Sequence, residues 1–523
     1  MFSKYIQIFN TVKFLKPKQI YYRLYYFGRA RVRRAIGDTP LLSIPSQSTH
    51  IRLQESIHIA DCYLGDKEFK FLNLSTKFEQ NIDWNYSKHG KLWTYNLNYF
   101  DFLSQKNENL RSLIDDFVEN SNKIKDGLEP FPISLRGINW IKYLSSHQIK
   151  EQKIDDSLYA QYYILLDNLE YHLLGNHLLE NGFSLLFGAY YFEDNKLYTK
   201  AKEILIKELT EQILKDGSHF ELSPMYHQIM LFRVLDCLNL VKNSKWKDKE
   251  LLEFLKVKAE LMLGWIESIS YQNGDIPLLN DSANSIAPTT KQLIYYANKL
   301  ELKSNKTPLS TSGYRKFTND NYESIIDIGD IGADYIPGHA HADTFNFELR
   351  IKGKPFIVDT GLSTYETCPR RTLERSTISH NTVEINSKDQ SEVWGGFRVA
   401  NRAYIIDIKE KDDQVEATHN GYKKENIYHS RQWKFEENRV IIKDKINKKS
   451  NAIARLHFHP DITKKEILEH LSSSSKLEFG EYFYSPEFNT QQTAIVVSIK
   501  FVDDLNIIIN TYATENSSKK NYH

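Results

Sequence analysis

The chain has 523 residues, which is long enough for about three domains of average size. Hydrophobic residues at 41% and charged residues at 26% are typical of globular proteins and exclude a wholly disordered or collagen-like chain. Sixty-eight lysines and arginines against 67 aspartates and glutamates give a formal charge of +1, so no global positive field is available to hold nucleic acid, and an acidic ligand must be bound locally.

The first 37 residues are basic and aromatic, with nine lysines and arginines and no acidic residue before Asp38. They lack the uninterrupted apolar segment of a secretory signal, and nowhere does an apolar run approach the roughly 18 residues that span a bilayer. This composition predicts either peripheral contact with an anionic membrane surface or a basic helix packed on its own domain.

The spacing of apolar residues changes near residue 310. From about Leu92 to Leu302 they recur at helical spacing, as in Tyr162, Leu165 and Leu169, which predicts a layer of successive helices. Beyond Ser312 the spacing shortens towards two. The expected strands include 326–331, 345–351, 403–408 and 505–509. Serial strands without helices between them predict antiparallel sheets, most simply a sandwich.

The segment 338–343, Gly-His-Ala-His-Ala-Asp, is the most informative one. On a strand, His339, His341 and Asp343 would lie on one face, because side chains repeat every two residues. Together with Asp359 and His380 downstream, these groups suit either a zinc site or a hydrogen-bonded polar layer.

Two polar clusters interrupt the helical half. Asn176 and His177 lie where a helix should start, so capping is the simplest role for Asn176. The second cluster contains Tyr226 and His227 beside an apolar helix, which indicates either a site or a solvated helix start.

Four motifs occur together and in order: Asn-His at 176–177, Ser-Pro-x-Tyr-His at 223–227, Gly-His-x-His-x-Asp at 338–343 and Ser-x-x-x-His-Asn-Thr-Val at 376–383. With them, the chain resembles the heparinase II/III-like polysaccharide lyases from about Leu92 to its C-terminus. The resemblance implies an incomplete (α/α) toroid over 91–310 and an antiparallel β-sandwich over 311–523, after an N-terminal segment of residues 1–90.

The resemblance also implies a reaction, β-elimination on a uronic-acid-containing polysaccharide. The C5 proton of the uronate is poorly acidic, because its removal adds charge to an anion, so the carboxylate must be neutralised while a base and an acid act. The implied catalytic residues are Asn176, His177, Tyr226, His339 and Tyr365. The expected substrate-binding residues are Arg136, Trp140, His227, Arg371 and Arg375, with toroid core as an equal alternative for Trp140.

By the same resemblance, His341, Asp359 and His380 match zinc ligands, and the zinc would be structural or orienting. The basic N-terminal segment is similar to that of lyase-like proteins of bacterial surface-polysaccharide production. We therefore expect a bacterial protein of the cytoplasm or the inner-membrane surface, with the periplasm left open, that acts on capsule or O-antigen. Two alternatives stay open: a catalytically silent glycan-binding scaffold and a zinc-dependent glycan hydrolase.

Overall fold

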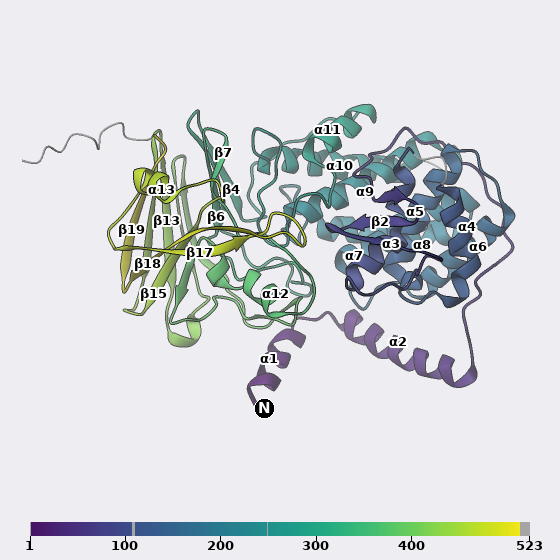
Figure 1. Ribbon diagram of the computed structural model, residues 1–523, viewed down its shortest axis with the longest axis horizontal. Coiled ribbons are helices and arrows are strands. Elements are labelled where there is room, and N and C mark those ends of the chain that lie inside the picture. The colour runs from purple at the N-terminus through teal and green to yellow at the C-terminus, as the bar shows by residue number, and fades with distance from the viewer. Residues whose placement is uncertain (1, 107–109, 248, 513–523) are drawn as a thin grey trace, which may run out of the picture.

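The computed structural model describes residues 2–106, 110–247 and 249–512. It consists of a helical lobe and a β-rich lobe that lie side by side, with two N-terminal helices along one edge (Figure 1). Those helices are α1 (Phe2–Val12) and α2 (Pro17–Ile36), and a small antiparallel sheet follows them, β1 (Tyr63–Gly65), β2 (Glu68–Phe71) and β3 (Leu74–Lys77). This small sheet was not among the expected strands.

The helical lobe is an incomplete toroid whose larger helices follow one another with short connections. They are α3 (Lys91–Tyr99), α4 (Arg111–Asn120), α5 (Pro130–Ser146), α6 (Gln152–Asp167), α7 (Gly175–Phe192), α8 (Asn195–Gln212), α9 (Pro224–Asn243), α10 (Glu250–Ile269) and α11 (Thr290–Lys299). Local signals start several of them. Asp194 caps α8 by accepting from two backbone N–H groups, and a Thr289–Gln292 capping box starts α11.

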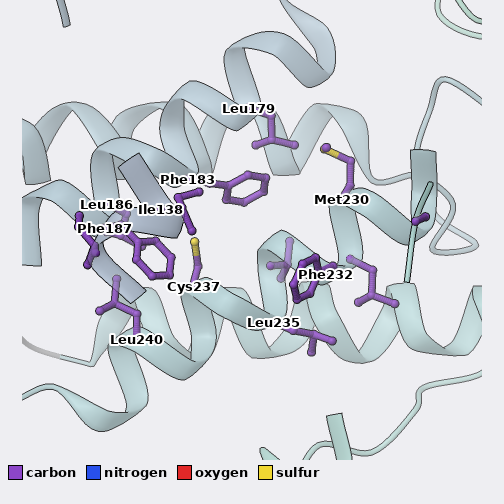
Figure 2. Close-up of a cluster of buried hydrophobic side chains, with 14 of the residues drawn as sticks. Ile138, Leu179, Phe183, Leu186, Phe187, Met230, Phe232, Leu235, Cys237 and Leu240 are labelled. Atoms are coloured by element: carbon purple, nitrogen blue, oxygen red, sulfur yellow. The ribbon is translucent and has the colours of Figure 1, made fainter. Parts of the chain in front are cut away.

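The core of this lobe lies where α5, α7 and α9 meet (Figure 2). Phe183 and Phe187 of α7 pack there with Ile138 of α5 and Leu235 of α9, all without solvent exposure. Every residue of α7 is buried except His177. The apolar residues on nearly every side of α7 predict a central helix, and the structure agrees. Because α7 is packed on all sides, the position of its first turn, with Asn176 and His177, is fixed.

The β-rich lobe is an antiparallel sandwich. Its sheets have the strand orders β11-β12-β13-β14-β19-β16, β17-β18-β15-β8 and β4-β5-β6-β7. The strands are β4 (Tyr314–Thr318), β5 (Tyr322–Asp327), β6 (Phe347–Ile351), β7 (Lys354–Ile357), β8 (Val383–Ile385), β11 (Ile405–Lys411), β12 (Gln414–His419), β13 (His429–Glu436), β14 (Arg439–Ile446), β15 (Ala452–His457), β16 (Leu471–Ser473), β17 (Leu477–Tyr484), β18 (Gln492–Phe501) and β19 (Asp504–Asn510). Strand β13 alternates strictly between buried and half-buried residues, so one face lies on the sandwich core.

The segment 338–343 is not a strand, and this prediction was wrong. It is a loop between β5 and β6, and its backbone groups bond to residues outside the sheets. The carbonyl of His339 accepts from the backbone N–H of Asp281, and the N–H of His341 donates to the Asn280 side chain. These bonds fasten the loop of the sandwich lobe to the end of the helical lobe. The histidines are therefore brought to the junction of the two lobes by a loop.

Candidate active site

Five side chains meet at the junction of the lobes, and we call them the junction site: Asn176, His177, Tyr226, His339 and Tyr365. The first three come from the first turns of α7 and α9 in the helical lobe. His339 lies on the loop after β5, and Tyr365 lies between β7 and α12 (Pro369–Glu374). The chain thus assembles the site from four separate segments.

Asn176 does not cap its helix. The N-cap position of α7 is Leu174, and Gly175 adopts a positive φ of 57° that lets the chain turn into the helix. The buried carboxylate of Glu221 accepts from the backbone N–H of Asn176 at 3.0 Å and from its Nδ2 at 2.9 and 3.0 Å. A carboxylate at a helix N-terminus is favourable, and here it also fixes the orientation of the Asn176 amide.

His177 is the half-exposed residue of an otherwise buried helix. Its Nδ1 lies 3.0 Å from Oε1 of Glu170, and because a carboxylate only accepts, Nδ1 donates. Burial lowers the pKa of His177, but the buried Glu170 carboxylate outweighs burial and the net shift is upward. The Glu170 carboxylate therefore favours the cationic form of the imidazole.

Tyr226 lies in the first turn of α9, where the Ser223 hydroxyl caps the helix by accepting from the Tyr226 N–H at 3.2 Å. Its phenol accepts a hydrogen bond from the Tyr365 hydroxyl at 3.3 Å. Burial raises the pKa of both phenols well above 10, and Arg371 offsets only part of that rise. The raised pKa favours the neutral form of both phenols, and a neutral Tyr226 has a proton to donate.

His339 joins the two halves of the site. Its ring stacks on Tyr226 with centroids 3.8 Å apart, and its Nε2 lies 3.4 Å from Nδ2 of Asn176. On the other side of the ring, Nδ1 lies 3.0 Å from Oδ2 of Asp281. Because the Asp281 carboxylate accepts, Nδ1 carries the proton and Nε2 is the nitrogen directed at the site.

Asp281 organises the layer behind the site. Its carboxylate accepts from Nδ1 of His339, from Nε2 of His341 at 2.8 Å and from both terminal nitrogens of Arg371, one of them at 2.6 Å. Burial alone would raise the pKa of this carboxyl, but Arg371 and the two histidines hold it well below its usual range. One buried charge thus positions three side chains from the sandwich lobe.

Comparisons with known proteins agree with this architecture. The sequence model for Heparinase II/III N-terminus matches residues 139–307, and the model for Heparinase II/III-like, C-terminal matches residues 302–504. The chain belongs to the heparinase II/III-like family. The two matches meet between α11 and β4, where the sequence changes from helical to strand spacing.

Two curated relatives and two solved structures illustrate the likeness. The heparin-sulfate lyase of Bacteroides stercoris is 25% identical over 254 residues, covering 42% of this chain and 37% of that protein, and that of Pedobacter heparinus is 24% identical over 334 residues, covering 58% and 49%. These matches span about half or less of the relatives' length. Heparinase III superposes with a TM-score of 0.62 at 15% identity, covering 96% of this chain and 93% of its own. A heparan sulfate lyase mutant from Pedobacter heparinus gives 0.55 at 17% identity, covering 86% and 82%. The structures support the toroid and sandwich fold.

The two arginines expected to bind substrate, in α12 and at its C-terminal end, are committed to bonds inside the protein, and the Arg371 guanidinium lies over the Tyr365 ring of the junction site at 5.0 Å. Arg371 is fully buried and held by Asp281 and by the carbonyl of Gly396. Arg375 donates to the carbonyls of Ala340 and Gly396, and burial lowers its pKa to about 9. Both fasten loops of the sandwich lobe, so the substrate-binding prediction for them is corrected.

Arg136 and Trp140 belong to the core of the helical lobe and not to its surface. Arg136 donates to the side chain of Gln161 and to the carbonyl of Asn98, and it is fully buried. Trp140 is also fully buried and packs edge-on against Phe117. The core alternative therefore applies to Trp140, and neither side chain is placed to contact a sugar.

His227 is likewise structural. Its Nδ1 accepts from the backbone N–H of His219 at 3.1 Å, so Nε2 carries the proton and donates to the carbonyl of Met262 at 3.0 Å. Burial lowers its pKa to about 3. A neutral ring with both nitrogens bonded inside the protein has no nitrogen left to bind substrate.

The expected zinc ligands are only partly arranged as ligands. Among the residues that the structure describes, no three His, Cys, Asp or Glu side chains are grouped to hold a metal ion. Asp359 instead accepts from Nδ1 of His380 at 2.7 Å, and also from Asn346 and Gly361. Nδ1 of His341 and Nε2 of His380 are buried without a hydrogen-bond partner, and their rings are 5.2 Å apart.

This arrangement offers a metal ion two nitrogen atoms, Nδ1 of His341 and Nε2 of His380. Each histidine donates one N–H to a buried carboxylate, His341 to Asp281 and His380 to Asp359, and keeps its other nitrogen free. Metal-binding histidines are usually oriented by a carboxylate in this way. Asp359 therefore orients the ring of His380, whereas the resemblance implied that Asp359 itself is a zinc ligand.

Three functional carboxylates were missed by the sequence reasoning. Glu170 holds His177, Glu221 holds Asn176, and Asp281 holds His339. Glu221 lies inside a polar cluster that was noticed without a role for it. Asp281 follows an apolar run in a loop, and nothing in the local sequence distinguishes it, because its partners lie 58 to 90 residues away.

Proposed function

We propose that the protein is a polysaccharide lyase that cleaves a uronic-acid-containing polysaccharide by β-elimination. The observation that carries this proposal is the contact chain Asn176, His339, Tyr226 and Tyr365 beside the protonated His177. In the proposal these residues act as carboxylate-binding groups, proton acceptor and proton donor. Family membership and the two curated heparin-sulfate lyases support the same reaction class.

In this mechanism His177 and Asn176 receive the uronate carboxylate. A cation and an amide at that group offset the charge that develops when the α-carbon loses its proton. Glu170 keeps His177 protonated and Glu221 keeps the Asn176 amide in one orientation. The two carboxylates thereby prepare the site before the substrate arrives.

His339 and Tyr226 carry the proton transfers. Nε2 of His339 accepts the C5 proton, the C–H electrons form the C4–C5 double bond, and the C4–O bond breaks. Tyr226 donates its phenolic proton to the departing oxygen, and the adjacent His339 then returns its proton to Tyr226. The sequence resemblance placed His339 only at the carboxylate. We assign it the base role because Asp281 accepts from Nδ1–H, which leaves Nε2 unprotonated on the site side of the ring, 3.4 Å from Nδ2 of Asn176 and 3.4 Å from Oε2 of Glu221.

The zinc implied by the resemblance is also part of the proposal. His341 and His380 would hold it through their free nitrogens, and it would tie the loop of His341 to the segment of His380. No proton transfer in the mechanism depends on it. Elemental analysis of the purified protein tests this assignment, and His380→Ala should lower both the metal content and the melting temperature.

We further propose that the substrate is a weakly sulfated bacterial surface polysaccharide, such as capsule or O-antigen. The support is the commitment of Arg136, Arg371 and Arg375 to bonds inside the protein, which leaves none of these three for sulfate groups. Arginine is the residue best suited to bidentate contacts with such anions.

The decisive experiment follows the ultraviolet absorbance of the unsaturated uronate during incubation with a panel of polymers. The panel should contain heparan sulfate, its desulfated form, alginate and bacterial uronate capsules. A rise with any polymer establishes elimination, and a preference for the sulfated polymer would overturn the second proposal alone. Chain shortening without absorbance would show hydrolysis. Binding without cleavage of every polymer would favour the scaffold alternative.

A further inference from the structure

The N-terminal arm, α1 and α2 with the turn between them, lies outside the stretch that the family models match. It runs along one edge of the molecule, with α1 below the sandwich lobe and α2 below the helical lobe (Figure 1). The arm is not part of the junction site. Its two faces differ in a way that indicates a partner.

The inward face of α2 is polar and aromatic and is fully engaged. Gln19 donates to the carbonyl of Leu173 at 3.0 Å, and Tyr22 stacks on Tyr171 with ring centroids 4.7 Å apart. Arg29 pairs with Asp167 on the same side. The body of the protein therefore holds this helix through its polar side.

The outward face of α2 is apolar. Tyr21, Leu24 and Phe27 are 61%, 68% and 58% exposed and follow one another at helical spacing. Val32 is 59% exposed and lies about three turns beyond Tyr21 on the same side of the helix. A helix on a water-exposed surface normally has the reverse arrangement, with its apolar side towards the core.

Helix α1 repeats this orientation on the sandwich lobe. Gln7 donates to Glu392 at 3.0 Å and Thr11 accepts from the Trp394 indole at 3.1 Å, so its polar side faces the protein. Tyr5 and Phe9 are 64% and 68% exposed on the other side. The two helices thus present one discontinuous apolar surface.

Basic residues border this surface. The arm has nine lysines and arginines and no acidic residue before Asp38. Arg23, Arg31 and Arg34 are exposed and form no ion pair with any residue that the structure describes. Arg31 lies over the Phe27 ring at 4.0 Å, so cation and apolar group sit together. The whole chain has a formal charge of +1, so the residues after the arm carry a formal charge of −8 and the positive charge is local to the arm.

We propose that the outward face of α1 and α2 docks on an anionic lipid surface. Apolar and aromatic side chains enter the boundary between headgroups and acyl chains, and flanking arginines bind the anionic headgroups. No helix within the described residues is long and apolar enough to cross a membrane, so the contact is peripheral. The occupant is an anionic membrane because the only unpaired charges on this face are positive.

The test is sedimentation of the full chain with lipid vesicles, one set of phosphatidylcholine and one with about a third phosphatidylglycerol. Wild type should bind the anionic vesicles and lose binding as salt rises. Arg31→Gln with Arg34→Gln should weaken that binding on the order of 20-fold. Leu24→Ser with Phe27→Ser should weaken it by about 10-fold or more.

Val257→Ser on α10 is the matched control, because that side chain is 61% exposed on the helical lobe away from the arm. It should bind vesicles as wild type does, and melting temperatures should show that every variant is folded. Equal binding by wild type and both double variants would overturn the proposal. So would dimerisation of wild type that Leu24→Ser with Phe27→Ser abolishes, since the face would then seat a second copy. Neither result depends on lyase activity.

Discussion

His177 and His380 show how the junction site differs from the buried polar layer behind it. Both imidazoles donate Nδ1–H to a buried carboxylate, Glu170 in one case and Asp359 in the other. His177 is half exposed at the start of a buried helix, whereas His380 is fully enclosed. The same histidine–carboxylate pair therefore leaves one imidazole open to solvent in the junction site and encloses the other in the buried layer.

The difference teaches that residue type alone does not identify a catalytic group. In the junction site, Asn176, His177 and His339 each have a carboxylate partner, and the Tyr226 phenol is bonded to Tyr365. In the buried layer, which we define as Asp281, His341, Asp359, Arg371 and His380, charges are matched within the protein. Removing a residue of the first kind should change the reaction, and removing one of the second should change the fold.

Tyr226→Phe tests the first half of that comparison most strongly. It removes the proposed proton donor and leaves the ring on His339, so turnover should fall on the order of 10² to 10⁴-fold with little change in stability. Tyr296→Phe is the matched control, because that phenol is buried and donates to Asp236 at 3.0 Å. Loss of the Tyr296 hydroxyl should lower the melting temperature and leave turnover unchanged. Steady-state rates at saturating substrate measure both, and near-normal turnover in Tyr226→Phe would remove it from the mechanism.

Asp281→Asn tests the second half. The neutral amide leaves the Arg371 charge buried without its partner, which should cost about 3 to 5 kcal/mol of unfolding free energy. The variant should also lose activity, because one amide oxygen cannot accept from His339, His341 and Arg371 as the two carboxylate oxygens do. Urea denaturation gives the free energy.

Asp444→Asn supplies the control for it. Asp444 accepts from Arg431 and His429 in the sandwich, in a similar buried network away from the junction site, and these partners lower its pKa to about 2. A similar loss of stability with unchanged turnover of the folded fraction is expected. If Asp281→Asn proves as stable as wild type, the buried layer does not depend on this carboxylate.

The sequence predicts more of the junction site than of the buried layer. The period change near residue 310 predicts the two lobes, and the four motifs contain Asn176, His177, Tyr226 and His339, whereas Tyr365 came from the resemblance alone. The catalytic roles of these residues stay predictions. The sequence did not predict which way a side chain points. Arg371 and Trp140 are residue types that often line sugar grooves, but both are buried here. Loop carboxylates such as Asp281 were also beyond reach, because only the folded chain brings their partners to them.

Glu170→Gln should have a smaller effect, confined to one side of the pH profile. Glu170 raises the pKa of His177, so the cation is present below that raised value and is lost as pH rises through it. Without the carboxylate the loss occurs at lower pH. KM should therefore begin to rise at lower pH in the variant than in wild type. Between the pKa of His177 in the variant and its pKa in wild type, KM of the variant should be about 10-fold higher, while kcat changes little.

Glu323→Gln controls for loss of a buried carboxylate. Glu323 pairs with Lys316 at 3.3 Å in the sandwich lobe and does not touch His177. Its KM profile should match that of wild type. An unshifted profile in Glu170→Gln would show that His177 does not meet the substrate as a cation.

Trp140→Phe should leave the reaction unchanged. The indole is buried against Phe100 and Phe117, with its Nε1 unpartnered, so a smaller ring costs packing, about 1 to 3 kcal/mol of unfolding free energy. A sugar-stacking role would instead raise KM in a variant of normal stability. Measuring KM and the melting temperature on the same preparation separates these outcomes, and an unchanged KM with a lowered melting temperature places Trp140 with the core of the helical lobe.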